Sequence, residues 1–115
     1  ATRLSAKEVV ALIHGCGGLA VASHIDRESF SIISQLGFVP ADLPLDAAEV
    51  SPRVAPADAA TAYASMTSLP FVRFSDAHRP EEIGAAVTEF ILAGPNLDEI
   101  RMALQGRDGR KVVWP

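Results

Sequence analysis

Two short segments of the sequence hold the side chains best suited to chemistry. Residues 23–27 read Ser-His-Ile-Asp-Arg and residues 75–78 read Ser-Asp-Ala-His, so together they contain two of the three histidines. An Asp-x-His sequence can present a carboxylate and an imidazole to one cavity, and this ligand pair suits a borderline cation such as Zn, Mn or Fe. Alternatively, Asp76 caps a nearby amide in an ordinary turn. The spacing alone leaves both interpretations open.

Each of these segments follows a predicted β-strand. Leu19–Ala22 is a short apolar run between Gly17-Gly18 and Ser23, typical of a strand buried on both faces, as in parallel sheets. Residues 69–74 form a second strand with a proline near its beginning. Functional groups in α/β sheets gather beyond the carboxyl ends of the strands, where loops converge. Both segments are therefore expected at one edge of a sheet.

The remaining pattern alternates helices with strands. Ser5 and Glu8 form a capping-box pair that begins a helix, and Asn96 can cap a second one that ends near Gly106. We also expect helices over 28–36, ending at Gly37, and over 57–66, and strands over 46–50, 87–92 and 111–114, with an irregular loop over 38–45 and Trp114 covering apolar surface. This order predicts an α/β fold: a mostly parallel sheet with flanking helices in one domain, residues 1–115.

The composition and net charge argue against some classes of binding partner, namely nucleic acid and membrane. The chain has 115 residues, of which 49% are hydrophobic and 21% charged, as in an ordinary globular domain. A net charge of −4 without a run of Lys or Arg removes the charge pattern that binds nucleic-acid backbone or anionic membrane, unless a bound cation reverses it locally. The single Cys16 fits a reducing, cytoplasmic compartment. No apolar stretch is long enough to span a bilayer, so no membrane partner is expected.

Two motifs resemble those of the PHP family, named for polymerase and histidinol phosphatase. Residues 17–24, Gly-Gly-Leu-Ala-Val-Ala-Ser-His, resemble the family's Gly-Gly-x-x-x-x-Ala-His segment. Residues 75–78 followed by Ile83-Gly84 are similar to its closing motif, and the order of elements matches from about residue 4 to residue 107. The resemblance implies a distorted seven-stranded β/α barrel with up to three metal ions at the carboxyl ends of its strands. Most characterised members hydrolyse phosphate esters.

The resemblance also implies roles for three residues. His24 matches the ligand of the second metal, Asp76 a ligand of the first and His78 a ligand of the third. The family's early His-x-His, further histidines and bridging carboxylate lie in an N-terminal half without a counterpart in this sequence. One protein ligand for each ion is too few to hold a transition metal firmly. We therefore expect weak or absent binding of divalent metal, and no catalysis, from this chain alone.

These observations define the function and partners that we expect. The chain resembles the C-terminal half of a metal-dependent phosphoesterase, a hydrolase that cleaves a phosphate ester with metal-activated water. Its substrate would be a phosphorylated small molecule or a nucleotide, and a missing N-terminal half or a complementing chain would complete the site. The open sheet edge of a half barrel predicts self-association into a homo-oligomer. The alternative is a non-catalytic interaction or regulatory module that keeps the fold.

Other polar residues have two interpretations each. Arg27 follows His24 by three residues and is a candidate for binding a substrate phosphate, although a surface salt bridge is equally consistent with its position. Glu49, Ser51 and Arg79 lie near predicted strand ends, where they would either line the same cleft or be solvated.

Two further residues have simpler interpretations. His14 lies in the last turn of the first predicted helix, where a cation is favoured. Cys16 has glycine neighbours and no base close in sequence, which argues against a catalytic thiol.

Overall fold

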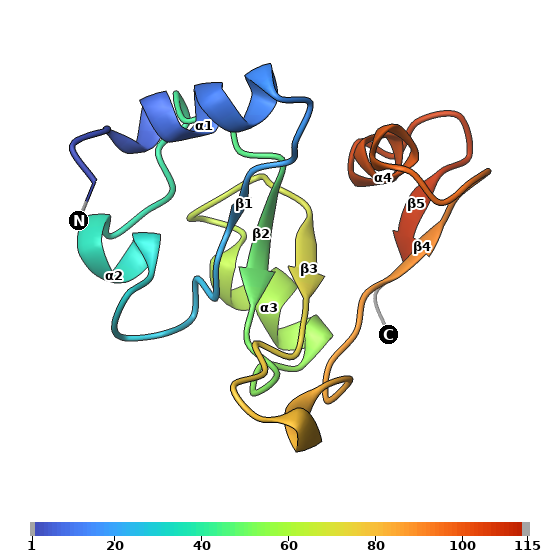
Figure 1. Ribbon diagram of the computed structural model, residues 1–115. Helices are drawn as coiled ribbons and strands as arrows, with labels where there is room; N and C mark the ends of the chain where they lie inside the picture. The colour runs from blue at the N-terminus through green and yellow to red at the C-terminus, as the bar shows by residue number, and fades with distance from the viewer. Residues whose placement is uncertain (1, 114–115) are drawn as a thin grey trace.

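The computed structural model describes residues 2–113, and its centre is a three-stranded parallel sheet. Strands β1 (Val21–Ala22), β2 (Ala47–Val50) and β3 (Phe71–Arg73) lie side by side in that order (Figure 1). Helices α1 (Ala6–Gly15), α2 (Ile32–Leu36) and α3 (Pro56–Tyr63) connect or precede them. The predicted α/β class and the parallel sheet are confirmed.

The C-terminal part forms a separate two-stranded sheet. Strand β4 (Glu89–Ile91) pairs antiparallel with β5 (Lys111–Val113), and α4 (Leu97–Leu104) lies between them in sequence. A single turn of 3-10 helix, η1 (Pro80–Glu82), precedes this unit. The sequence predicted a mostly parallel sheet, and β4 and β5 depart from it because they form an antiparallel sheet of their own.

A side chain explains why β4 does not extend the parallel sheet. The Thr88 hydroxyl accepts a hydrogen bond from the Arg73 amide at 2.7 Å and donates one to the Arg73 carbonyl at 2.8 Å. These are the two backbone groups of β3 that a neighbouring strand would otherwise bind at this position. Thr88 thus occupies the backbone amide and carbonyl of Arg73 at the outer edge of β3. The chain then turns away, and β4 pairs with β5.

The two faces of the sheet hold two hydrophobic clusters. On one face Ala22, Ala48 and Val50 pack with Ile25 and with Ala59 of α3. On the other face the cluster consists of buried Ala47, Val72 and Leu104, with Leu19, Phe90, Ile100 and Val112 packed against it. The alternation of Ala47 and Ala48 follows from the two-residue period of a strand. The sheet is thereby fixed between α3 and the C-terminal unit, which holds its loops in place.

The ends of the helices follow the sequence closely, except for the start of α2 and the end of α3, which ends at Tyr63 and not at the predicted residue 66. Ser5 and Glu8 make the predicted capping box, Asn96 accepts the Glu99 amide at 3.0 Å, and Gly37 ends α2 with φ of 78°. Helix α2 begins only at Ile32, because Ser31 is its cap and the preceding residue, Phe30, has φ of 60°. The predicted start at residue 28 was wrong for this reason.

Strand β1 is the other edge of the parallel sheet, and within residues 2–113 no strand pairs with its outer side. Ala22 is buried but the side chain of Val21 is 37% exposed, so the prediction of burial on both faces was wrong for β1. Trp114, predicted to cover apolar surface, lies outside the described residues. Within the described part of the chain, no helix has the length and apolar character required to cross a membrane.

Candidate functional site at the carboxyl ends of the strands

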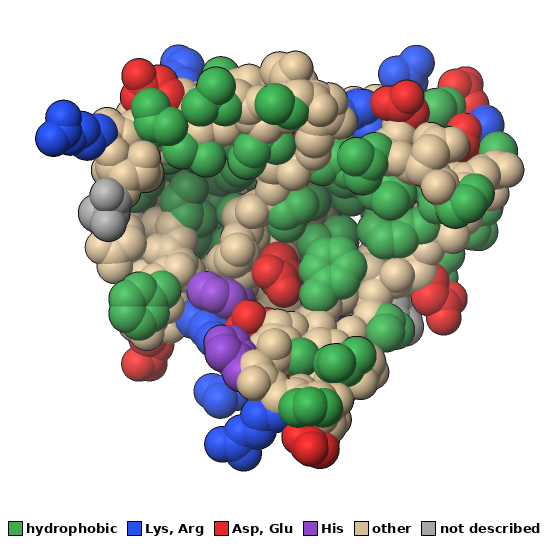
Figure 2. Space-filling view, viewed as in Figure 1, with side chains coloured by type: hydrophobic (Ala, Val, Ile, Leu, Met, Phe, Trp, Pro, Cys, Tyr) green, Lys and Arg blue, Asp and Glu red, His purple; other side chains and the backbone are tan. Residues whose placement is uncertain are grey.

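The two polar segments singled out from the sequence meet at the carboxyl end of the parallel sheet. Arg27, in the loop after β1, and Asp76, in the loop after β3, form an ion pair with 2.6 Å between Nη2 and Oδ2. Figure 2 shows histidine side chains beside basic and acidic groups below the strand ends of Figure 1. The predicted convergence of the two loops is present in the structure.

His24 has an unusual backbone and an unpartnered ring nitrogen. Its φ is 27°, a left-handed conformation uncommon for a non-glycine residue, and its amide donates a hydrogen bond of 3.4 Å to Glu49 Oε2. The Nδ1 atom of His24 is buried and has no hydrogen-bond partner within the described part of the chain. Because buried polar atoms are normally paired, this nitrogen is available to a ligand.

Asp76 and His78 are arranged by a tight turn. Asp76 has φ of 48°, and its carbonyl accepts a hydrogen bond of 2.8 Å from His78 Nδ1. A carbonyl only accepts, so Nδ1 carries the proton and Nε2 of the neutral ring has a free lone pair. The His78 amide in turn donates to Glu82 Oε2 at 2.8 Å. These bonds orient the exposed His78 ring as they would a metal ligand.

Glu49 adds a carboxylate between these groups. It is half-buried in β2, the strand between β1 and β3. Burial raises the pKa of Glu49, and the nearby Asp76 charge raises it further, whereas the His24 amide, His24 and Arg27 oppose the shift. Its predicted position near a strand end was right, and its carboxylate faces the His24 amide, but Glu49 is not among the residues that line the cavities beside the site.

The pairing of Asp26 with Ser51 was not anticipated from the sequence. Asp26 accepts hydrogen bonds from both the amide and the hydroxyl of Ser51, each 2.6 Å long, and Ser51 is almost completely buried. These bonds join the loop after β1 to the end of β2. The one available signal was that Ser51 directly follows a predicted strand and that Asp26 lies four residues after the end of another.

A cavity of about 500 Å³ lies beside these groups. Asp76, His78 and Arg79 line it from the loop after β3, and Arg27 and Arg53 line it from the loops after β1 and β2. A second cavity of about 560 Å³ shares Arg27, Ser51 and Arg53 with the first. His24 lines neither cavity, and nowhere in residues 2–113 do three or more His, Cys, Asp or Glu side chains gather as a metal-binding group.

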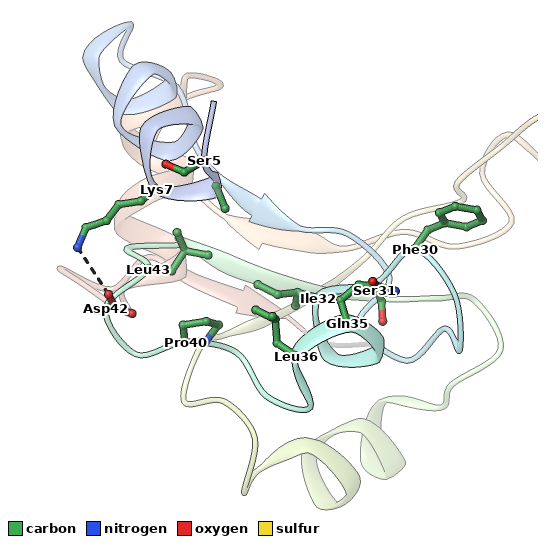
Figure 3. Close-up of a pocket in the computed structure, with 11 residues that line it drawn as sticks. Ser5, Lys7, Phe30, Ser31, Ile32, Gln35, Leu36, Pro40, Asp42 and Leu43 are labelled. Carbon is green, nitrogen blue, oxygen red and sulfur yellow. Dashed lines mark ion pairs between the residues drawn. The ribbon is translucent and has the colours of Figure 1, made fainter. Parts of the chain in front are cut away.

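A more apolar cavity of about 760 Å³ lies elsewhere, between α1 and α2 (Figure 3). Ile32, Leu36 and Leu43 contribute to its wall, and the Lys7–Asp42 ion pair, 3.6 Å long, lies at its side. Its lining provides no histidine or cysteine. We therefore place the chemistry at the carboxyl ends of the strands rather than here.

His14 and Cys16 are separate from this site. His14 Nε2 lies 2.8 Å from Asp46 Oδ2, and the same oxygen accepts the Ala20 amide at 2.7 Å. His14 therefore has a partner that the helix-end interpretation did not include. Cys16 is exposed and is a free thiol.

Comparisons with known proteins support the resemblance that the motifs indicated. Residues 57–108 match the family model described as PHP-associated, a segment that includes Asp76 and His78 but not His24. No curated protein matches the sequence. Two crystal structures of Endonuclease Q do resemble the fold.

The first is a lesion-specific endonuclease from Pyrococcus furiosus, with 25% identity over 95% of this chain and a TM-score of 0.73. The second is Endonuclease Q in complex with a 27-mer duplex substrate that has an abasic lesion at the active site, with 24% identity over 94% of this chain and a TM-score of 0.72. The match covers 28% of the length of each of these proteins. Over residues 57–108 the chain thus matches a PHP-associated family model, and its fold resembles that of Endonuclease Q, in agreement with the resemblance that the two strand-end motifs indicated.

Proposed function

We propose that residues 1–115 are part of one PHP-like domain, the C-terminal half of a distorted barrel, whose complete site hydrolyses a phosphate ester with metal-activated water. The observation that carries this proposal is the ion pair between Arg27 and Asp76. It brings the loops after β1 and β3 together, so the residues of both motifs face one region. The PHP-associated match and the likeness to an endonuclease support a phosphate ester as the substrate.

The proposed metal ligands are His24, Asp76 and His78. The buried Nδ1 of His24 has no partner within the described residues, and the tautomer of His78 leaves Nε2 free to bind a cation. Imidazole and carboxylate together suit Zn, Mn or Fe. Such ions, when bound, would lower the pKa of a water molecule and stabilise the leaving alkoxide.

Arg27 has two roles in this proposal. In the structure its guanidinium neutralises Asp76. A cation bound by Asp76 would replace that positive charge, and Arg27 would then be free for a substrate phosphate, which guanidinium binds well. Arg27 would therefore bind the substrate phosphate, as predicted, only after a cation has displaced it from Asp76.

Further protein residues are needed to complete the site. Three ligands distributed over three ions leave most coordination positions to water, so binding by this chain alone should be weak. We propose that a polypeptide segment elsewhere in a longer protein, or a second chain, supplies the remaining ligands by packing against the open edge of β1. The neighbour's duplex substrate favours a nucleic-acid phosphodiester over a phosphorylated small molecule.

The same open edge bears on the state of the isolated chain. Val21 at that edge and Leu12 of α1 are exposed, as are Leu36 of α2 and Phe38 after it. Exposed apolar groups beside an unpaired strand favour association with a second copy. We expect self-association at tens of micromolar, and sedimentation that shows only monomer would contradict this part of the proposal.

The proposal is tested by metal binding and by hydrolysis. Titration calorimetry with Mn²⁺ should give weak binding to the 115-residue chain, and weaker binding still to the Asp76→Asn and His78→Ala variants. The control is His14→Ala, which removes a histidine outside the site. Adding the complementing segment should produce phosphodiesterase activity that a chelator abolishes. If His24→Ala and Asp76→Asn leave metal binding and activity unchanged, a non-catalytic module is the better description.

A further inference from the structure

Two arginines beside the candidate site have no counter-ion among residues 2–113. Arg53, after β2, and Arg79, after β3, line the 500 Å³ cavity together with Asp76 and His78. In the described part of the chain neither guanidinium lies within 4.0 Å of a carboxylate, whereas Arg27 is paired with Asp76. Both side chains are exposed. They are therefore free to bind an anion.

The carboxylates nearby do not compete strongly for these guanidinium groups. Asp26 accepts two hydrogen bonds of 2.6 Å from Ser51, and Glu82 accepts the His78 amide at 2.8 Å. Asp76 holds Arg27, and Glu28 lines only the second cavity. Three arginines and two carboxylates, Asp76 and Glu82, line the first cavity, so its lining has an excess of one positive charge in a chain whose net charge is −4. A local site of this kind can bind a polyanion that the whole molecule would repel.

The number of cationic groups exceeds what one phosphate requires. Under the proposed function, the ions and Arg27 would serve the phosphate that is cut. Arg53 lines both cavities, whereas Arg79 lines only the first, so the two arginines can serve different phosphates. A phosphomonoester has no second phosphate to offer, whereas a nucleic-acid strand has one on each side of the cleaved bond.

We propose that Arg53 and Arg79 bind phosphates that flank the cleaved ester of a nucleic-acid strand, and so select a polynucleotide over a phosphomonoester. This inference rests on the proposed function for its substrate chemistry. Contacts of this kind position the strand without reading its sequence. Binding should therefore depend strongly on salt and weakly on base composition.

The test measures binding of a fluorescein-labelled single-stranded oligonucleotide of roughly 12 nucleotides by anisotropy, over a salt series and with a chelator present. The double variant Arg53→Gln/Arg79→Gln should bind about tenfold more weakly at low salt. The slope of log K against log salt should fall in magnitude by about 1.4, because each phosphate that the protein no longer neutralises accounts for about 0.7. The matched control is Arg107→Gln, an exposed arginine outside both cavities.

A second arm separates flanking phosphates from the cleaved one. In this arm Mn²⁺ replaces the chelator, so that the site of the cleaved phosphate can form. A nucleoside monophosphate should then bind equally well to the wild-type chain and to the double variant, because it offers no flanking phosphate. The proposal is overturned if wild type shows no salt-dependent binding, if Arg107→Gln weakens binding as much as the double variant, or if the double variant loses monophosphate binding too. The oligonucleotide titrations contain a chelator, so their outcomes are independent of the metal titration that tests the proposed function.

Discussion

The Nη2 atom of Arg27 lies 2.6 Å from Oδ2 of Asp76, across 49 positions of sequence. The two side chains are 39% and 24% exposed, so the pair is partly shielded from solvent and ions. Partial burial strengthens the attraction relative to a surface pair. The ion pair has a chemical consequence, because a carboxylate paired with a guanidinium is less available to a metal ion.

Replacing Arg27 with Gln should raise the affinity of the chain for Mn²⁺. Removal of a positive charge beside Asp76 eliminates both the competitor for the carboxylate and its repulsion of the cation, and an increase of a few-fold to about tenfold is expected. Titration calorimetry of wild type, Arg27→Gln and the distant Arg107→Gln measures the difference. Equal or weaker Mn²⁺ binding by Arg27→Gln would separate Asp76 from any metal site.

The pair of Asp26 and Ser51 should be important for stability. Ser51→Ala removes a buried hydroxyl that donates to Asp26 at 2.6 Å, and leaves one carboxylate oxygen with fewer partners. We expect a loss of about 1–3 kcal/mol in the free energy of unfolding. Urea denaturation followed by circular dichroism measures this loss, with the exposed Ser65→Ala as the matched control. Similar midpoints for the two variants would mean that the bond contributes little.

Thr88 should anchor the C-terminal unit to β3. Thr88→Val keeps the shape of the side chain but removes both hydrogen bonds to the Arg73 backbone. The cost should be about 1–3 kcal/mol, and the Arg73 amide should exchange faster with deuterated solvent. Thr61→Val, at an exposed position of α3 where the hydroxyl bonds only the Ala57 carbonyl, is the control. Unchanged exchange at Arg73 would show that Thr88 does not hold this edge.

The free energy of unfolding should depend on pH through the ionisation of Glu99. The Arg110 side chain above all, and then the Ala93 amide, lower the pKa of Glu99 below its ordinary 4.5. The folded state therefore binds this proton less readily than the unfolded state. The stabilisation from Glu99 is complete above the unfolded pKa of about 4.5, and is lost as the pH falls through the lower folded pKa.

The check compares the unfolding free energies of wild type and Glu99→Gln from about pH 6 to about pH 3. The difference between them should be constant above about pH 4.5 and should shrink below it. Glu81→Gln, which changes an exposed carboxylate without an ion pair in residues 2–113, is the control. A difference that is flat over the whole range would contradict the assigned role of the Glu99–Arg110 pair.

Local structure could be predicted from the sequence because its causes are local. Ser5 and Glu8 are three residues apart, so their capping box forms within one helical turn. The glycine at position 37 accepts φ of 78° at little cost, and it ends α2 where the pattern predicted. The strands that precede His24 and Asp76 were recognisable from their apolar runs and from the glycine, proline and polar residues around them.

The arrangement of the site depended on contacts between distant residues. No sequence pattern specifies that Asp26 binds Ser51, or that Thr88 satisfies both backbone groups of Arg73, because these partners lie 25 and 15 positions apart. The Thr88 hydrogen bonds also decided that β4 leaves the parallel sheet. Residue types that suit a strand do not determine which strand will be their neighbour.

The sequence by itself determined the residue types at the site, the strand ends that carry them and the resemblance to the PHP family. Only the tertiary structure decided that Arg27 neutralises Asp76 and that Arg53 and Arg79 are left without counter-ions among the described residues. The physical reason is that propensity and capping act over a few residues, whereas an ion pair depends on distances set by packing of the whole sheet. Charge compensation at a site is therefore a property of the fold.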